Sequence, residues 1–284
     1  IMRKDTTKRN FSMNQKISSG NPLLWGIVIL VIIAVSSCTD FFADVNLQKN
    51  WEEMESGKIV VHYRTEGFSS AISPSVEDVQ SILKNQNLYY RAIQDSIHQT
   101  FTDKVMIYLY NKDEGEDLIG TDGGGHAIPK MNCFYYVYLP ERRELTDQYN
   151  IKNAPLGAHE LVHVISHRAL GYPPTKMMSE GYAVWLDGNY GGYSINDIIR
   201  KYRDDEPEKI MTPNELLKET FDKESVYYPN AGVLIRYLVR TYGIEKINQL
   251  FISPKDEFRE DFRKITGDEW EKMGEAYDRY INSL

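Results

Sequence analysis

The chain contains 284 residues, enough for one large domain or two small ones with a sizeable buried core. Apolar residues make up 42% of it and charged residues 26%, and the mean hydropathy is −0.48. These values exclude a multi-span membrane protein, a collagen-like fibre and a fully disordered chain. Lysine and arginine number 33 against 41 aspartate and glutamate residues, and the resulting net charge of −8 argues against a nucleic-acid partner.

The first 37 residues are typical of a secretory signal. Five basic residues precede an apolar run at 23–35, which is shorter than the roughly 20 residues of a stable membrane span. The run ends in Val-Ser-Ser-Cys, which resembles the bacterial lipobox, and this resemblance implies that Cys38 is lipidated and becomes the first mature residue. We therefore expect an envelope lipoprotein whose partner is a lipid membrane. An uncleaved anchor is the alternative, and a start at Met13 would still leave a basic residue before the apolar run.

The mature chain has no cysteine pair with which to build a disulfide or a thiolate metal site. Besides Cys38, its only cysteine is Cys133, so any metal site must use histidine and carboxylate ligands. Residues 38–57 are polar and mixed, which predicts a tether, and residues 58–284 form the predicted folded domain.

Hydrophobic periodicity predicts strands first and helices second. Strands are expected at 58–64, 105–110 and 133–139, a long helix at 75–98, and a glycine-rich connection at 120–127. From residue 153 onward the pattern is helical, at roughly 155–170, 179–187, 195–204, 212–221, 229–252 and 256–282. This order predicts an α+β fold in which a small mixed β-sheet lobe (58–150) is followed by a mainly helical lobe (151–284).

A His-Glu-x-x-His sequence carries the chemistry. His159 and His163 are four residues apart on a predicted helix, so both can reach one tetrahedral ion from the same helix face. Glu160 lies beside the first histidine, where it can take a proton from a water molecule that the metal activates. The sequence predicts one Zn²⁺ ion, and the alternative is a pair of core histidines with polar neighbours.

Glu180 is the predicted third ligand. It lies on the next predicted helix, and the 16 residues between it and His163 leave room for a loop and an antiparallel return. His167 is a poorer candidate, because on an unbroken helix it lies about 12 Å along the axis from His159. We therefore interpret His167 as a residue that packs or supports a ligand.

His159, Glu160, His163 and the later Ser-Glu-Gly-Tyr-Ala sequence around Glu180 resemble the zinc-binding helices of gluzincin metallopeptidases, closest to the peptidase MA-like proteins of the thermolysin and aminopeptidase group. The resemblance implies a zincin-like fold with the active-site helix between the two lobes. It also implies that the two histidines and Glu180 bind zinc while Glu160 acts as general base. In the aminopeptidase branch an acidic residue seven positions after the ligand glutamate supports the site, and Asp187 occupies that position.

The same resemblance suggests further site residues. Tyr228, with Tyr227 as the alternate, matches the tyrosine that stabilises the oxyanion in that branch. Gly124, Gly125 and Ala127 match the strand along which the substrate backbone pairs, with a plain turn as the alternative. This stretch lacks the glutamate with which aminopeptidases hold a free amine, so the resemblance does not extend to a dedicated aminopeptidase.

The leading hypothesis is a lipid-anchored zinc metallopeptidase that acts on a peptide or protein substrate. A zinc-binding module without catalysis is one alternative, and a metal hydrolase of a non-peptide amide is another. The general base favours an enzyme, because a purely structural metal site has no use for a base beside an open coordination position.

Overall fold

The computed structural model describes residues 51–64, 73–112, 124–141, 144–146, 151–219 and 223–284. Its main sheet has the strand order β1-β2-β3-β5-β4. The strands are β1 (Glu52–Ser56), β2 (Ile59–Tyr63), β3 (Val105–Tyr110), β4 (Gly124–Ile128) and β5 (Cys133–Val137). The pairs β2–β3 and β3–β5 are parallel, whereas β1–β2 and β4–β5 are antiparallel, so the predicted mixed sheet is confirmed.

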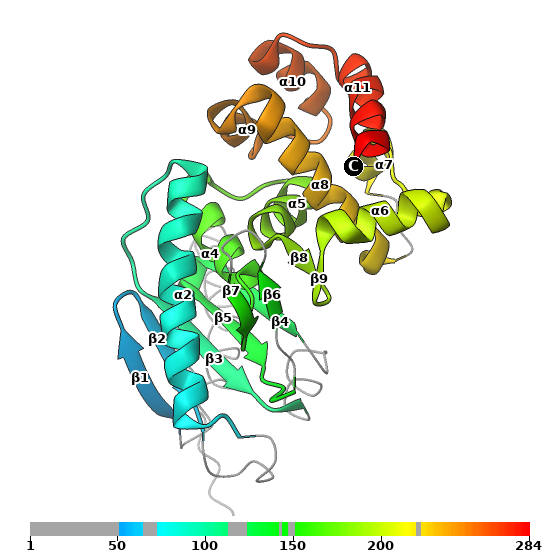
Figure 1. Ribbon diagram of the computed structural model, residues 1–284. Coiled ribbons are helices and arrows are strands. Elements are labelled where there is room, and N and C mark those ends of the chain that lie inside the picture. The colour runs from blue at the N-terminus through cyan, green and yellow to red at the C-terminus, as the bar shows by residue number, and fades with distance from the viewer. Residues whose placement is uncertain (1–50, 65–72, 113–123, 142–143, 147–150, 220–222) are drawn as a thin grey trace, which may run out of the picture. The chain divides into compact units, whose positions relative to one another are not determined.

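Helix α2 (Val76–Ile97) covers one face of this sheet (Figure 1). Its start is fixed by a capping box, in which Ser75 accepts from the backbone of Asp78 and the Asp78 side chain accepts from the backbone of Ser75. The alternating apolar residues of the central strands meet the apolar stripe of the helix, and together they form one part of a continuous core. The members include Ile59, Val61, Val105, Ile107, Phe134, Val79, Ile82, Tyr89 and Ile93.

The second part of the domain is mainly helical, as predicted. Its helices are α4 (His159–Leu170), α5 (Lys176–Asp187), α6 (Ile195–Asp205), α7 (Pro213–Lys218), α8 (Glu224–Tyr242), α9 (Ile244–Leu250), α10 (Phe258–Thr266) and α11 (Trp270–Ser283). Short 3-10 turns occupy Pro129–Met131 and Pro207–Lys209. Two small hairpins pair β6 (Glu144–Thr146) with β7 (Ile151–Ala154) and β8 (Asn189–Tyr190) with β9 (Tyr193–Ser194).

The two long C-terminal helices that the sequence predicts are each broken by a glycine. Gly243 separates α8 from α9 with φ of 88°, and Gly267 ends α10 with φ of 89°, a backbone conformation that costs a residue with a side chain more than glycine. Helix α8 also begins at Glu224 rather than at Pro229. The proline fits inside the helix because the Ser225 carbonyl, which its missing N–H leaves free, accepts a hydrogen bond from the Tyr202 hydroxyl at 3.2 Å.

The sheet begins earlier in the chain than predicted. Strand β1 falls within the segment 38–57 that the sequence assigns to a tether, and its backbone pairs with β2 from Glu52 to Ser56. Its largely exposed side chains explain why the polar composition concealed a strand. The predicted signal segment and Cys38 lie outside the described residues. In the part of the chain that the structure describes, no helix is both long and apolar enough to cross a membrane.

Candidate metal centre

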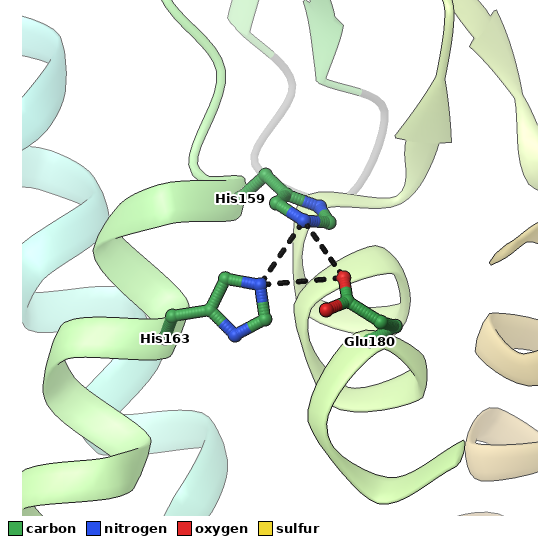
Figure 2. Close-up of side chains that lie close together, drawn as sticks. All are labelled: His159, His163 and Glu180. Atoms are coloured by element: carbon green, nitrogen blue, oxygen red, sulfur yellow. Dashed lines mark hydrogen bonds and ion pairs between the residues drawn. The ribbon is translucent and has the colours of Figure 1, made fainter. Parts of the chain in front are cut away.

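Helices α4 and α5 place the predicted ligands opposite one another (Figure 2). Helix α4 begins at His159 without a cap from its own sequence. Instead, the buried carboxylate of Asp187 accepts the backbone N–H of Ala158 at 2.7 Å, and the Gln86 amide of α2 donates to the Gly157 carbonyl at 2.8 Å. A carboxylate at a helix N-terminus is stabilised by the helix dipole. The first turn of α4 is thereby fixed by two other helices.

The three ligand atoms form a nearly equilateral triangle. His159 Nε2 and His163 Nε2 are 3.2 Å apart, and Glu180 Oε2 lies 3.3 Å from the first and 3.4 Å from the second. A tetrahedral zinc ion with bonds of about 2.0 to 2.2 Å separates its ligand atoms by roughly 3.3 to 3.6 Å. Three atoms at the corners of such a triangle cannot all be joined by well-aligned hydrogen bonds, so the arrangement fits a central ion better than mutual hydrogen bonding.

This group is a possible metal site and matches the His-Glu-x-x-His pattern of zincins. Within the described ranges it is the one set of three or more histidine, cysteine or acidic side chains whose ligand atoms all lie within 4.8 Å of one another. Two imidazoles and a carboxylate suit zinc and leave a fourth position for another ligand. Cys133 takes no part, because it is buried on β5 and its burial raises the pKa of its thiol to about 12.

The site attracts positive charge. Burial disfavours the charged form of His159, but Glu180, Glu160 and Asp187 outweigh this effect and raise the pKa of His159 to about 9. Burial also opposes ionisation of Glu180, yet the facing His163 and His159 hold the pKa of its carboxyl well below its usual range. The metal-free protein therefore holds a proton close to the place where a cation would bind.

The Glu160 side chain approaches strand β4 and lines the same cavity as the ligands. A methyl group built on Gly125 of β4 would come within 2.7 Å of Glu160 Cγ, 2.7 Å of the Tyr135 carbonyl and 2.8 Å of the Tyr136 ring. The absence of a side chain at Gly125 thus leaves the space that the Glu160 side chain occupies. The cavity between β4 and α4 has a volume of about 640 Å³, and both Glu160 and the three ligand residues line it.

The predicted substrate strand forms one wall of that cavity. Gly124, Gly125 and Ala127 belong to β4, which ends the strand order of the sheet, and all three line the cavity. They therefore lie in an extended strand rather than in the glycine-rich connection that the sequence also suggested. The resemblance implied a strand here, whereas periodicity alone did not, because three consecutive glycines lack the β-branched or aromatic side chains by which strands are recognised.

The structure separates the two candidate tyrosines. Tyr227 is fully buried and its hydroxyl donates to the Leu216 carbonyl at 2.9 Å, away from the ligands. Tyr228 lines the cavity, and its ring stacks on His159 with centroids 6.2 Å apart. Burial and the carboxylates of Glu180 and Glu224 raise the pKa of Tyr228 above its usual range, so its phenol remains a proton donor.

His167 is not part of the ligand group. Its Nε2 lies 3.2 Å from the Ser179 hydroxyl, and the same hydroxyl lies 3.4 Å from Nδ1 of His163. Burial, with a smaller contribution from the neighbouring His163, lowers the pKa of His167 to about 4. The predicted supporting position of His167 agrees with this geometry, whereas Ser179 was not identified from the sequence. Ser179 could have been found in the sequence as a polar residue that directly precedes Glu180 and follows two apolar methionines.

Close packing of two glycines sets the position of α5. A methyl group built on Gly232 of α8 would lie 2.5 Å from Val184 Cγ1 and 3.0 Å from Val184 Cβ, and one on Gly181 would lie 2.6 Å from Ile235 Cγ1. Helices α5 and α8 therefore approach more closely than side chains would allow. The helix that carries Glu180 rests directly on the backbone of its neighbour.

Comparison with known proteins adds no assignment. No protein-family model matches this chain, and no curated protein matches it either. The candidate function accordingly rests on the geometry of the site.

Proposed function

We propose that this chain is a zinc-dependent metallopeptidase. One observation carries the proposal: His159, His163 and Glu180 form a ligand triangle of tetrahedral dimensions at a cavity wall, and Glu160 lines the same cavity. A site used only for structure would be closed by a fourth protein ligand, whereas the described residues supply three.

When bound, a zinc ion would supply a Lewis acid that polarises the scissile carbonyl and makes a water molecule acidic near neutral pH. The Glu160 carboxylate would accept the proton of the attacking water and pass it to the leaving nitrogen. The Tyr228 O–H would donate a hydrogen bond to the carbonyl oxygen as that oxygen gains negative charge. Asp187 would hold the first turn of α4, and hence His159, in place.

The open strand β4 supports a peptide as the substrate. It pairs with β5 on one side and has no strand partner on its other side within the described sheet. An extended peptide can pair with such an edge through its backbone, which requires no particular side-chain sequence. No carboxylate occurs among the residues of β4, so this strand offers no negatively charged side chain to pair with a free amino terminus.

For the cellular location we propose attachment to the bacterial envelope through a lipid on Cys38. The support is the composition of the first 37 residues and the Val-Ser-Ser-Cys sequence alone.

The decisive test is digestion of a peptide library by the zinc-loaded protein and by its Glu160→Gln variant. Glu160 lies outside the ligand triangle, so the variant should keep its zinc content while its cleavage rate falls at least 10²- to 10⁴-fold. His163→Ala should lose the metal, as measured by elemental analysis. A zinc-loaded wild type that cleaves no member of the library, or a Glu160→Gln variant as fast as wild type, would refute the proposal.

A further inference from the structure

A hydroxyl on α5 connects two histidines of α4. Ser179 Oγ lies 3.4 Å from Nδ1 of His163 and 3.2 Å from Nε2 of His167, so one hydroxyl bridges the ring of a ligand and the ring of a residue that is not a ligand. The three side chains are partly or fully buried, and the rings of the two histidines are in edge contact with centroids 5.4 Å apart. Solvent therefore does not replace these contacts easily.

The metal dictates the direction of the hydrogen bonds. Nε2 of His163 faces the other two ligand atoms, so it must present a lone pair to a cation, and the ring proton must then reside on Nδ1. That N–H donates to Ser179 Oγ. Since the hydroxyl has only one proton, it has to donate onward to Nε2 of His167, which must be the unprotonated nitrogen of that ring.

Without a metal the opposite direction is also available. His167 Nε2–H can donate to Ser179, and Ser179 to His163 Nδ1, which leaves a proton on His163 Nε2 facing Glu180 at 3.4 Å. In that direction His163 cannot bind a cation. A neutral imidazole carries one proton and one lone pair, so the His167 ring can serve in either direction.

We propose that Ser179 and His167 are positioning residues that stabilise the metal-binding tautomer of His163 when a cation is bound. His167 accepts the Ser179 proton, which frees the hydroxyl oxygen to hold His163 Nδ1–H. This assigns a purpose to a third histidine that lies too far along α4 to join the ligands. This direction requires a proton on His167 Nδ1, a buried atom with no hydrogen-bond partner among the described residues, and that unpaired N–H is its energetic cost. The inference rests on the proposed zinc site but concerns residues that do not touch the ion.

The first test is ¹⁵N NMR of the histidine rings during zinc titration, with zinc content measured in parallel. We expect both His163 and His167 to adopt the Nδ1–H form in the zinc-loaded protein. Zinc bound with His167 in the Nε2–H form would overturn the present inference and leave the proposed function standing. A wild type that binds no zinc would overturn the proposed function itself.

The second test measures zinc affinity by competition with a chelator. Loss of a residue that orients a ligand typically costs 10- to 100-fold in metal affinity, so Ser179→Ala should weaken zinc binding by that amount and Ser179→Thr, which keeps the hydroxyl, should restore it. His167→Phe should weaken binding in the same direction, because the hydroxyl proton then turns back toward His163.

The control is Ser166→Ala, which removes a buried hydroxyl from the same helix next to His167. Its hydroxyl has no hydrogen-bond partner among the described residues, and we expect wild-type affinity. If Ser179→Ala fails to fold, the His167→Phe measurement and the NMR experiment still decide. Wild-type zinc affinity in both folded Ser179→Ala and His167→Phe would overturn the inference.

Discussion

The contact between α5 and α8 offers a way to move one ligand without changing any ligand. Gly232→Ala adds a methyl group that faces Val184 on α5, the helix that carries Glu180. The built methyl lies 3.0 Å from Val184 Cβ, which is 0.4 Å short of the 3.4 Å at which ordinary contact begins. Because Cβ is attached to the main chain, rotation of the valine side chain cannot relieve this overlap, and the two helices must separate by several tenths of an ångström.

Two opposing effects set the change in stability. Overpacking of a core costs about 1 to 3 kcal/mol, and replacing glycine with alanine inside a helix returns about 1 kcal/mol. Gly274→Ala in α11 is the matched control, since its methyl group would meet only Pro213 Cγ at 4.0 Å. The control should therefore gain about 1 kcal/mol. The free energies of unfolding of the two variants should differ by roughly 1 to 3 kcal/mol, and each kcal/mol corresponds to about 2 to 4 °C in Tm.

Zinc affinity is the more specific measurement. Metal–ligand distances in proteins are fixed to about 0.2 Å, so a shift of several tenths of an ångström in Glu180 should lower zinc affinity by about tenfold or more. Chelator competition and thermal unfolding of the metal-free variants measure the two effects separately. Wild-type zinc affinity in Gly232→Ala, combined with a Tm equal to that of Gly274→Ala, would refute the idea that glycine packing positions the ligand.

Three further predictions concern the tyrosines, the proton balance and the anchor. Tyr228→Phe should lower turnover by roughly 10²- to 10³-fold with little loss of stability. Tyr227→Phe should leave turnover unchanged and lower Tm, because the Tyr227 hydroxyl donates to the Leu216 carbonyl. Equal turnover in the two variants would contradict this assignment. Because the pKa of His159 is raised to about 9, zinc binding at pH 7 should release close to one proton from this ring, as measured by calorimetry in buffers of different ionisation enthalpy. The raised pKa also means that protonation of the His159 ring stabilises the metal-free fold fully below its ordinary pKa of 6.5, and that this contribution is lost as the pH rises through about 9. Because the same proton competes with zinc, zinc affinity should increase between these two pH values. A zinc affinity that does not change with pH would contradict this prediction. Cys38→Ser should remove the protein from the membrane fraction or leave it unprocessed, and a wild-type protein found only in the soluble fraction would disprove the lipid anchor.

Local patterns predicted the parts of the fold that local interactions determine. The strand Val105–Tyr110 and the helix Val76–Ile97 follow from alternating and helical periodicity, and the structure places them as expected, to within a residue for the helix. Helix breaks at Gly243 and Gly267 were missed, because an apolar pattern can continue through a single glycine whose positive φ is not visible in the sequence. Strand β1 was missed because its pairing partner, rather than its composition, makes it a strand.

In the candidate site, too, the sequence predicted the residues that local spacing brings together and missed those that distant contacts position. His159 and His163 were predictable from a spacing of four, which any helix converts into proximity. The position at which α4 begins was not predictable, because the carboxylate at its N-terminus comes from Asp187, 29 residues beyond Ala158. Gln86 was also missed, although a polar residue on the apolar stripe of α2 was a usable signal.

The ligands and the space around Glu160 are determined by different parts of the fold. All three ligand side chains come from α4 and α5, whereas Gly125, which leaves room for the Glu160 side chain, comes from the sheet. A small change in the spacing between β4 and α4 would alter the surroundings of Glu160 and leave the ligand triangle unchanged. If the proposed peptidase activity is correct, a preparation fully loaded with zinc could then be inactive, so zinc content and cleavage rate must be measured separately.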